Sequence, residues 1–78
     1  MGRKPKDAEQ SVINKIEFHR TKAGLSRQEL ADKVDVHYQT IGYIERGEYS
    51  PSLVLALKIS KALGKKVEQV FEIEEEKS

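Results

Sequence analysis

Hydrogen-bonding side chains recur at helical spacing in the segment VHYQTIGYIER, residues 36–46. Tyr38 and Gln39 lie one helical turn before Gly42 and Tyr43, so four-residue steps bring all four residues into one patch. A glutamine amide offers both a donor and an acceptor, and a tyrosine adds a hydroxyl group and a flat ring. A helix that showed these groups to water alone would gain nothing from them, which predicts that the patch recognises another molecule.

Catalytic and metal chemistry have little support in this sequence. The chain contains no cysteine and two histidines, and His19 and His37 are too far apart for a shared helical metal site. No Gly-rich phosphate loop is present, and the Ser, His and Asp residues are not at a recognisable catalytic spacing. We therefore expect no enzymatic activity, no metal and no cofactor, with His19 half-buried and His37 acting as a helix cap or a backbone contact.

The patch needs a scaffold, and the strongest helix signals lie directly before it. In LSRQELADKV, Ser26 as N-cap and Glu29 three residues later form a capping box. This helix is expected to end near Val34, because Asp35 tolerates the left-handed conformation that a turn requires. The helix within 36–46 then follows after about two connecting residues, so the two helices must cross steeply.

Weaker signals place the other elements. Residues 11–23 begin with a β-branched pair and continue as a helix that Gly24 ends. Ser50 as N-cap and Pro51 at the first helical position predict a helix up to Gly64. Its predicted buried residues are Leu53, Leu57, Ile59, Ala62 and Leu63, and a last short helix is expected from Val67 to Phe71.

The length and composition allow one small domain. The 78 residues carry a net charge of +1, with 35% charged residues. We expect a flexible basic arm at 1–10, a folded domain at 11–73 and an acidic tail at 74–78. The longest apolar run, LVLAL, is far too short to span a bilayer, so we expect a cytoplasmic protein without a membrane segment.

The string GLSRQELADKVDVHYQTIGYIERGEYSPSLVLALKISKALG resembles the XRE family, the helix-turn-helix domain of phage repressors and Cro. The resemblance extends from about Asn14 to Phe71. It implies an all-α, five-helix, phage-repressor-like domain in which the helix beginning near Val36 lies in the DNA major groove. By further resemblance to short stand-alone members, a two-stranded antiparallel ribbon is expected from Val12–Ile13 and Phe71–Ile73, residues that strand propensity also favours.

The resemblance also implies a set of DNA contacts. Arg27 matches a phosphate contact, and it can flank a phosphate held at the N-terminal amides of its helix. The amide of Gln39 can pair with N6 and N7 of adenine. Gly42 costs about 1 kcal/mol of helix stability relative to Ala, which predicts that space is needed there for the Tyr38 ring or for close approach to DNA. The expected DNA-binding residues are Arg27, Gln28, His37, Tyr38, Gln39, Thr40, Tyr43 and Arg46.

Two further expectations concern the scaffold and the oligomer. Arg20 and Glu45 match a family pair that ties the first helix to the third, and we predict a partly buried, bidentate salt bridge. Regulators of this kind are dimers. The candidate interface is the apolar part of the last helix, namely Val67, Val70 and Phe71.

The sequence therefore predicts a sequence-specific transcriptional regulator that binds double-stranded DNA as a homodimeric repressor on an inverted repeat. The alternative from another class is a protein-interaction module with the same fold, either an antitoxin or a coactivator-like adaptor with a protein partner. Two interpretations also stay open for Arg3, Lys4 and Lys6, which form either an arm for the minor groove or a solubilising tail.

Overall fold

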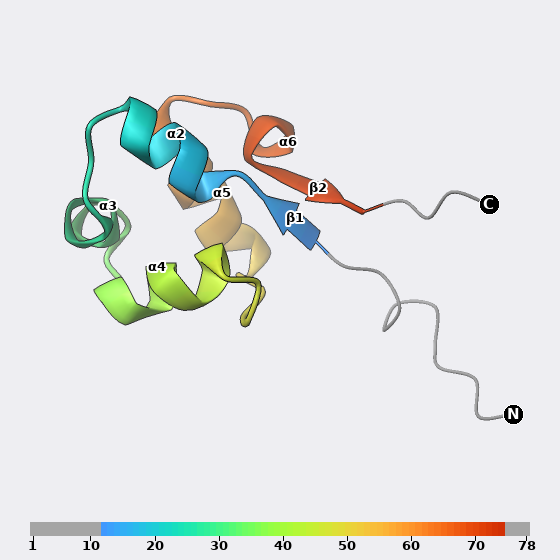
Figure 1. The fold of residues 1–78 in the computed structure, drawn as a ribbon, viewed down its shortest axis with the longest axis horizontal. Coiled ribbons are helices and arrows are strands. Elements are labelled where there is room, and N and C mark those ends of the chain that lie inside the picture. Colours follow the sequence, from blue (N-terminus) through green and yellow to red (C-terminus); the bar gives the residue numbers. More distant parts are fainter. Residues whose placement is uncertain (1–11, 75–78) are drawn as a thin grey trace, which may run out of the picture.

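The two ends of the described chain lie side by side (Figure 1). The computed structural model describes residues 12–74, in which β1 (Val12–Asn14) pairs in antiparallel fashion with β2 (Phe71–Ile73). This pairing confirms the expected two-stranded ribbon. The predicted basic arm and the last four residues of the predicted acidic tail fall in 1–11 and 75–78, outside the described residues.

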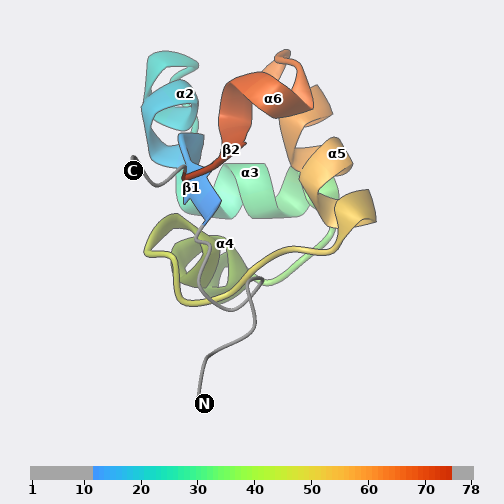
Figure 2. The same cartoon turned by 90° about the vertical axis from the view of Figure 1, so that its right-hand side faces the viewer.

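Five helices occupy the rest of residues 12–74, and none of them is long and apolar enough to cross a membrane. Figure 2 shows α4 below the ribbon, α5 along the right-hand side, and α2 and α6 at the top of the view. The core is aliphatic and draws on every helix. The helices are α2 (Ile16–Lys22), α3 (Arg27–Val34), α4 (Tyr38–Glu45), α5 (Leu53–Leu63) and α6 (Val67–Val70).

The predicted start and end of α3 are confirmed. The Ser26 hydroxyl accepts a hydrogen bond from the backbone N–H of Glu29 at 3.0 Å, and the Glu29 carboxylate accepts one from the N–H of Ser26 at 2.7 Å. Asp35 has a φ of 60°, in the left-handed region. The turn that follows is short, and Figure 1 shows α3 end-on while α4 is seen from the side, as expected for a steep crossing.

The predicted cap of α5 was wrong. Ser52 is the N-cap, with its hydroxyl accepting from the N–H of Leu55 at 3.1 Å, and Pro51 lies before the cap rather than inside the helix. Ser50 and Ser52 have the same capping chemistry and stand two residues apart. The sequence signal therefore does not distinguish the two serines.

The predicted buried face of α5 was also partly wrong. Leu53 and Leu57 are 71% and 49% exposed, and Val54 beside them is 62% exposed. Ile59 and Leu63 are buried as expected. Because every residue from 53 to 57 is apolar, the helical period cannot single out one face in this stretch.

The last helix is one residue shorter than predicted, because Phe71 takes an extended conformation and begins β2. Val70 has 0% exposure and belongs to the core, so the expectation that it faces a partner subunit was wrong. A four-residue helix has room for one inward position, and Val70 fills it. Val67 and Phe71 are partly exposed.

Candidate nucleic-acid interface

The helix α4 divides into a buried aliphatic side and an exposed polar side. Ile41 and Ile44 are 0% and 2% exposed, whereas Tyr38 and Tyr43 are 44% and 46% exposed. Gln39 is exposed as well. Within residues 12–74, the side chains of these two tyrosines and of Gln39 make no hydrogen bond to protein, so their polar groups are available to a ligand.

The N-terminal end of α4 is capped by a histidine. The imidazole Nδ1 of His37 accepts a hydrogen bond from the backbone N–H of Gln39 at 3.2 Å. The ring of His37 also stacks on the ring of Tyr38, with centroids 5.1 Å apart. The capping role expected for His37 is confirmed, its contact with the DNA backbone stays a prediction, and α4 begins two residues later than the predicted helical segment.

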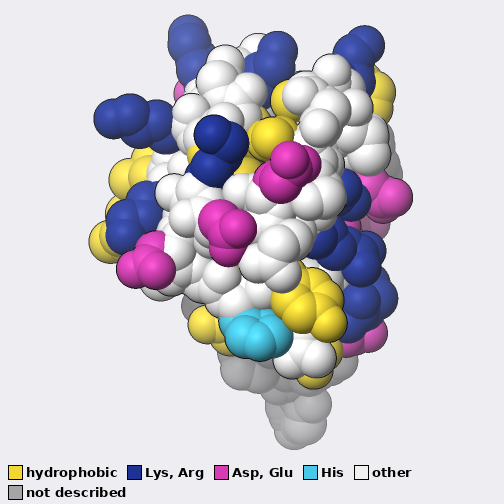
Figure 3. All heavy atoms as spheres, turned by 90° about the vertical axis from the view of Figure 1, so that its left-hand side faces the viewer, with side chains coloured by type: hydrophobic (Ala, Val, Ile, Leu, Met, Phe, Trp, Pro, Cys, Tyr) yellow, Lys and Arg dark blue, Asp and Glu magenta, His cyan; other side chains and the backbone are white. Residues whose placement is uncertain are grey.

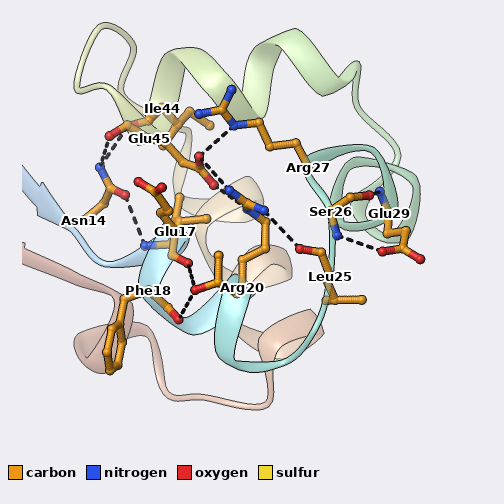
Figure 4. A network of polar contacts seen from close by, with 12 residues as sticks. Asn14, Glu17, Phe18, Arg20, Leu25, Ser26, Arg27, Glu29, Ile44 and Glu45 are labelled. Atoms are coloured by element: carbon orange, nitrogen blue, oxygen red, sulfur yellow. Dashed lines mark hydrogen bonds and ion pairs between the residues drawn. The ribbon is translucent and has the colours of Figure 1, made fainter.

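The C-terminal end of α4 is tied to α2 by the predicted salt bridge. Arg20 donates from Nε to Oε2 of Glu45 at 2.8 Å and from Nη2 to Oε1 at 3.3 Å, so the pair is bidentate (Figure 4). The two side chains are only 11% and 2% exposed. A third bond from Arg20 reaches the carbonyl oxygen of Leu25 at 3.0 Å, which fixes the guanidinium group between three elements.

Arg27 joins the same carboxylate from α3. Its Nε donates to Oε1 of Glu45 at 2.8 Å, and its side chain remains 40% exposed (Figure 4). The sequence predicts a phosphate contact for Arg27 and gives no sign of this bond, because the two residues are 18 apart along the chain. One buried carboxylate thus serves two guanidinium groups.

Asn14 is a positioning residue that sequence reasoning missed. Its amide donates to the carbonyl oxygen of Ile44 at 2.9 Å, which satisfies an acceptor in the last turn of α4. Its Oδ1 accepts from the N–H of Ile16 at the start of α2, at 3.2 Å. Asparagine before a helix is a capping signal that could have revealed the second bond, but the first depends on a partner 30 residues away.

Gly42 is buried rather than exposed, which corrects the prediction for this position. A Cβ atom at Gly42 would lie 3.2 Å from Nη1 of Arg46 and 3.5 Å from Nη1 of Arg27. The three atoms nearest that position all belong to these arginines, so the space serves them and not the Tyr38 ring. Arg46 also lies over the ring of Tyr43, with its guanidinium carbon 5.2 Å from the centroid.

The structure brings five of the eight predicted DNA-binding residues together around one surface hollow of about 210 Å³. In Figure 3, Lys and Arg side chains gather along one edge of the lower half, on the face that α3 and α4 share. Gln28 lies outside the hollow and donates to Asp32 at 2.9 Å, and Thr40 is partly buried. Gly42 forms part of the lining together with Arg27, Tyr38, Gln39, Tyr43 and Arg46.

A short turn between α3 and α4, with a polar outward face on the second helix, defines a helix-turn-helix DNA-binding fold. The family model described as helix-turn-helix, HTH_3, matches residues 16–70. The chain therefore belongs to this family, the XRE family of transcriptional regulators. Its members are DNA-binding regulators rather than enzymes.

Relatives and solved structures agree with this membership. The chain is 49% identical over 63 residues to the uncharacterized HTH-type transcriptional regulator YgzD of Bacillus subtilis, covering 81% of this chain and 96% of that protein. A regulator of Methanothermobacter thermautotrophicus is 47% identical over 62 residues, covering 78% and 90% of the two chains. The restriction-modification controller protein C.AhdI from Aeromonas hydrophila superposes with a TM-score of 0.68 at 33% identity, over 70% of this chain and 83% of that one.

Proposed function

We propose that this regulator binds specific sequences in double-stranded DNA by placing α4 in the major groove. The observation that carries the proposal is the outward face of α4, where Tyr38, Gln39 and Tyr43 are exposed and make no hydrogen bonds to protein within the described chain. The opposite face is anchored in the core through Ile41 and Ile44. A fixed helix with free polar groups on one side is what base-edge recognition requires.

The side chains on this face divide by chemistry. Gln39 offers the amide that pairs with adenine, and the tyrosines offer hydroxyl groups for base edges and rings for a thymine methyl group. Arg27 and Arg46 carry the positive charge of the hollow and suit backbone phosphates. We assign His37, Gln28 and Thr40 to supporting contacts at the edges of the same face.

We further propose that two copies bind an inverted repeat with half-sites about 34 to 36 Å apart. The dimer interface we favour keeps Val67 and Phe71, which are partly exposed, and omits Val70. The exposed apolar side chains of Leu53, Val54 and Leu57 on α5 are a second candidate for it.

Specific binding can be tested by selection from a random duplex library at roughly physiological salt. At this salt concentration the sequence-independent attraction between protein and phosphates does not dominate the affinity. We expect a palindromic consensus with the stated spacing. The Gln39→Ala variant should lose about 1 to 3 kcal/mol on the consensus and relax the preference at one base pair. A selection without enrichment would overturn specific binding and favour the protein-interaction alternative.

We propose repression as the outcome of binding. In-vitro transcription from a promoter that carries the selected site should yield less transcript as wild-type protein is added, and the Gln39→Ala variant should need more protein for the same effect. An increase in transcript would contradict the repressor assignment while leaving DNA binding intact.

A further inference from the structure

Two guanidinium groups meet over Gly42, one from Arg27 at the start of α3 and one from Arg46 directly after α4. The Nη1 atoms of Arg46 and Arg27 lie 3.2 and 3.5 Å from the position that a Cβ of Gly42 would take. The distance between the two Nη1 atoms therefore cannot exceed the sum of these two values. One phosphate group can bridge such a gap with a separate oxygen for each nitrogen, because each charge-assisted bond is about 2.8 Å long. Two like charges at this separation repel each other unless an anion joins them.

The arginine and glutamate side chains in and around the hollow carry a net charge of about +1. Glu45 is shared between Arg20 and Arg27, with Nε–O distances of 2.8 Å to both. In the part of the chain that the structure describes, the one carboxylate that pairs with Arg46 is Glu48, at 3.3 Å, and both of these side chains are about half exposed. Three arginines thus face two carboxylates, and the surplus lies where the Arg27 and Arg46 side chains converge.

Both arginines are held so that their terminal nitrogens point into the hollow. The Nε of Arg27 is occupied by Glu45, and the Nε of Arg46 faces Glu48 while its guanidinium carbon lies over the Tyr43 ring. The Nη1 atom of each remains over Gly42. The hollow measures about 210 Å³, several times the roughly 30 Å³ that one water molecule occupies in the liquid.

We propose that this hollow, the Gly42 site, binds one phosphate group between Arg27 and Arg46, and that Gly42 is the residue that lets the two side chains converge. The inference rests on the proposed function in one respect, since we assign the phosphate to the DNA backbone. It goes further by assigning two arginines to a single phosphate. Free inorganic phosphate shares the chemistry, and the experiments below separate the two sources.

The first test counts phosphates through the salt dependence of binding to the selected duplex. The slope of log K against log salt becomes shallower by about 0.9 for each phosphate that the protein no longer neutralises. We expect Arg27→Ala, Arg46→Ala and the double variant to reduce the slope by the same single step. Each single variant should weaken binding roughly tenfold, and the double variant little more than that. Lys65→Ala, in the loop between α5 and α6 at the far end from α4 (Figure 1), is the control and should leave slope and affinity unchanged.

The outcomes of this test are distinct. Multiplicative losses of affinity and a slope change of two steps in the double variant would show that each arginine has its own phosphate, which overturns the shared site. A loss from Arg46→Ala confined to duplexes with guanine at one position would also overturn it, because Arg46 would then read a base. Either result leaves the proposed DNA binding standing.

Gly42→Ala isolates the role of the glycine. Alanine favours the helix by about 1 kcal/mol, so the variant should fold at least as well as the wild type. Its methyl group would touch Nη1 of Arg27 at an ordinary contact distance of 3.5 Å, but at 3.2 Å from Nη1 of Arg46 it would displace that atom and fill the floor of the hollow. DNA binding should therefore weaken several-fold, with the same reduction of slope. Unchanged binding would overturn the role of Gly42.

A second test works on the free protein and does not depend on DNA binding. Titration with inorganic phosphate, followed by NMR of the arginine Nε–H groups, should give saturable shifts at Arg27 and Arg46 that are several-fold weaker in Gly42→Ala. Shifts that rise linearly without saturation would overturn the site.

Replacing single phosphates of the duplex by uncharged methylphosphonates tests whether the bound phosphate belongs to the DNA backbone. At one position the replacement should weaken wild-type binding and leave the double variant unaffected. Saturable binding of free phosphate with no such position in the duplex would overturn the DNA assignment.

Discussion

At its C-terminal end α4 is bound by three side chains from other elements, Asn14, Arg20 and Arg27, whereas its N-terminal end is capped by one hydrogen bond that the His37 side chain accepts. The bonds that these three side chains make to the C-terminal end are part-buried, and the cap is exposed. The difference shows how a helix in so small a domain can be fixed in direction while its first turn stays accessible. The accessible turn carries Tyr38 and Gln39, which we propose to contact bases.

The largest loss of stability is expected when the carboxylate that Arg20 and Arg27 share is removed. Glu45→Ala leaves Arg20, which is 11% exposed, without its partner, and removal of one member of a buried pair costs about 3 to 5 kcal/mol. We expect a loss of this size in urea denaturation of the full chain. Glu45→Gln, which keeps the shape and the acceptor oxygen, should lose less. A loss below about 1 kcal/mol in the alanine variant would contradict the anchoring role.

Asn14→Ala tests the anchor from the side of the ribbon. It leaves the carbonyl oxygen of Ile44 without its side-chain donor, which should cost about 1 to 2 kcal/mol of unfolding free energy. Asn14→Asp is the matched variant, because it keeps the acceptor for the N–H of Ile16 but replaces the donor with a carboxylate oxygen that the carbonyl oxygen of Ile44 repels, so it should lose at least as much stability as Asn14→Ala. Equal stability of the wild type and both variants would show that the end of α4 needs no such contact.

His37→Ala tests the other end of the helix. Loss of an N-cap costs about 1 kcal/mol, and His37→Ser should restore most of it because a serine hydroxyl can accept the same N–H. Thermal unfolding followed by circular dichroism measures both variants. If serine were no better than alanine, the stacking of His37 on Tyr38, and not the hydrogen bond, would be the stabilising contact.

The smallest loss of stability is expected from an exposed ion pair at the ribbon. This pair tests whether burial or bond length sets the strength of an ion pair. Lys15 and Glu72 form an ion pair of 2.8 Å, the same length as the shortest bond between Arg20 and Glu45, yet their side chains are 46% and 45% exposed. Glu72→Gln should therefore change stability by less than about 1 kcal/mol. A loss as large as that of Glu45→Ala would mean that distance, and not burial, sets the strength of these pairs.

Local signals explain what the sequence could predict. The Ser26 capping box, the left-handed Asp35 and the alternation of buried and exposed residues on α4 each depend on residues a few positions apart. The ribbon and the bidentate bridge of Arg20 and Glu45 came from family resemblance, and both are present.

The missed features depend on partners distant in sequence. The bonds of Glu45 to Arg27 and of Asn14 to Ile44 join residues 18 and 30 positions apart, and no short-range pattern encodes them. Gly42 was misread for the same reason, since its cover comes partly from α3. The buried face of α5 was mispredicted for another reason. A run of apolar residues shows no helical period, so the buried face cannot be chosen from the sequence.

The ribbon has a consequence for the order in which the protein folds. Val12 pairs with Ile73, so nearly the whole described chain must close into a loop before the strands can meet. The turns of α3 and α4 need only neighbouring residues and should form early, as expected for a helical domain with mostly local contacts. We expect φ-values near zero for substitutions in β1 and β2, and the ribbon should be the first part of the native protein to open and exchange its amide protons with solvent.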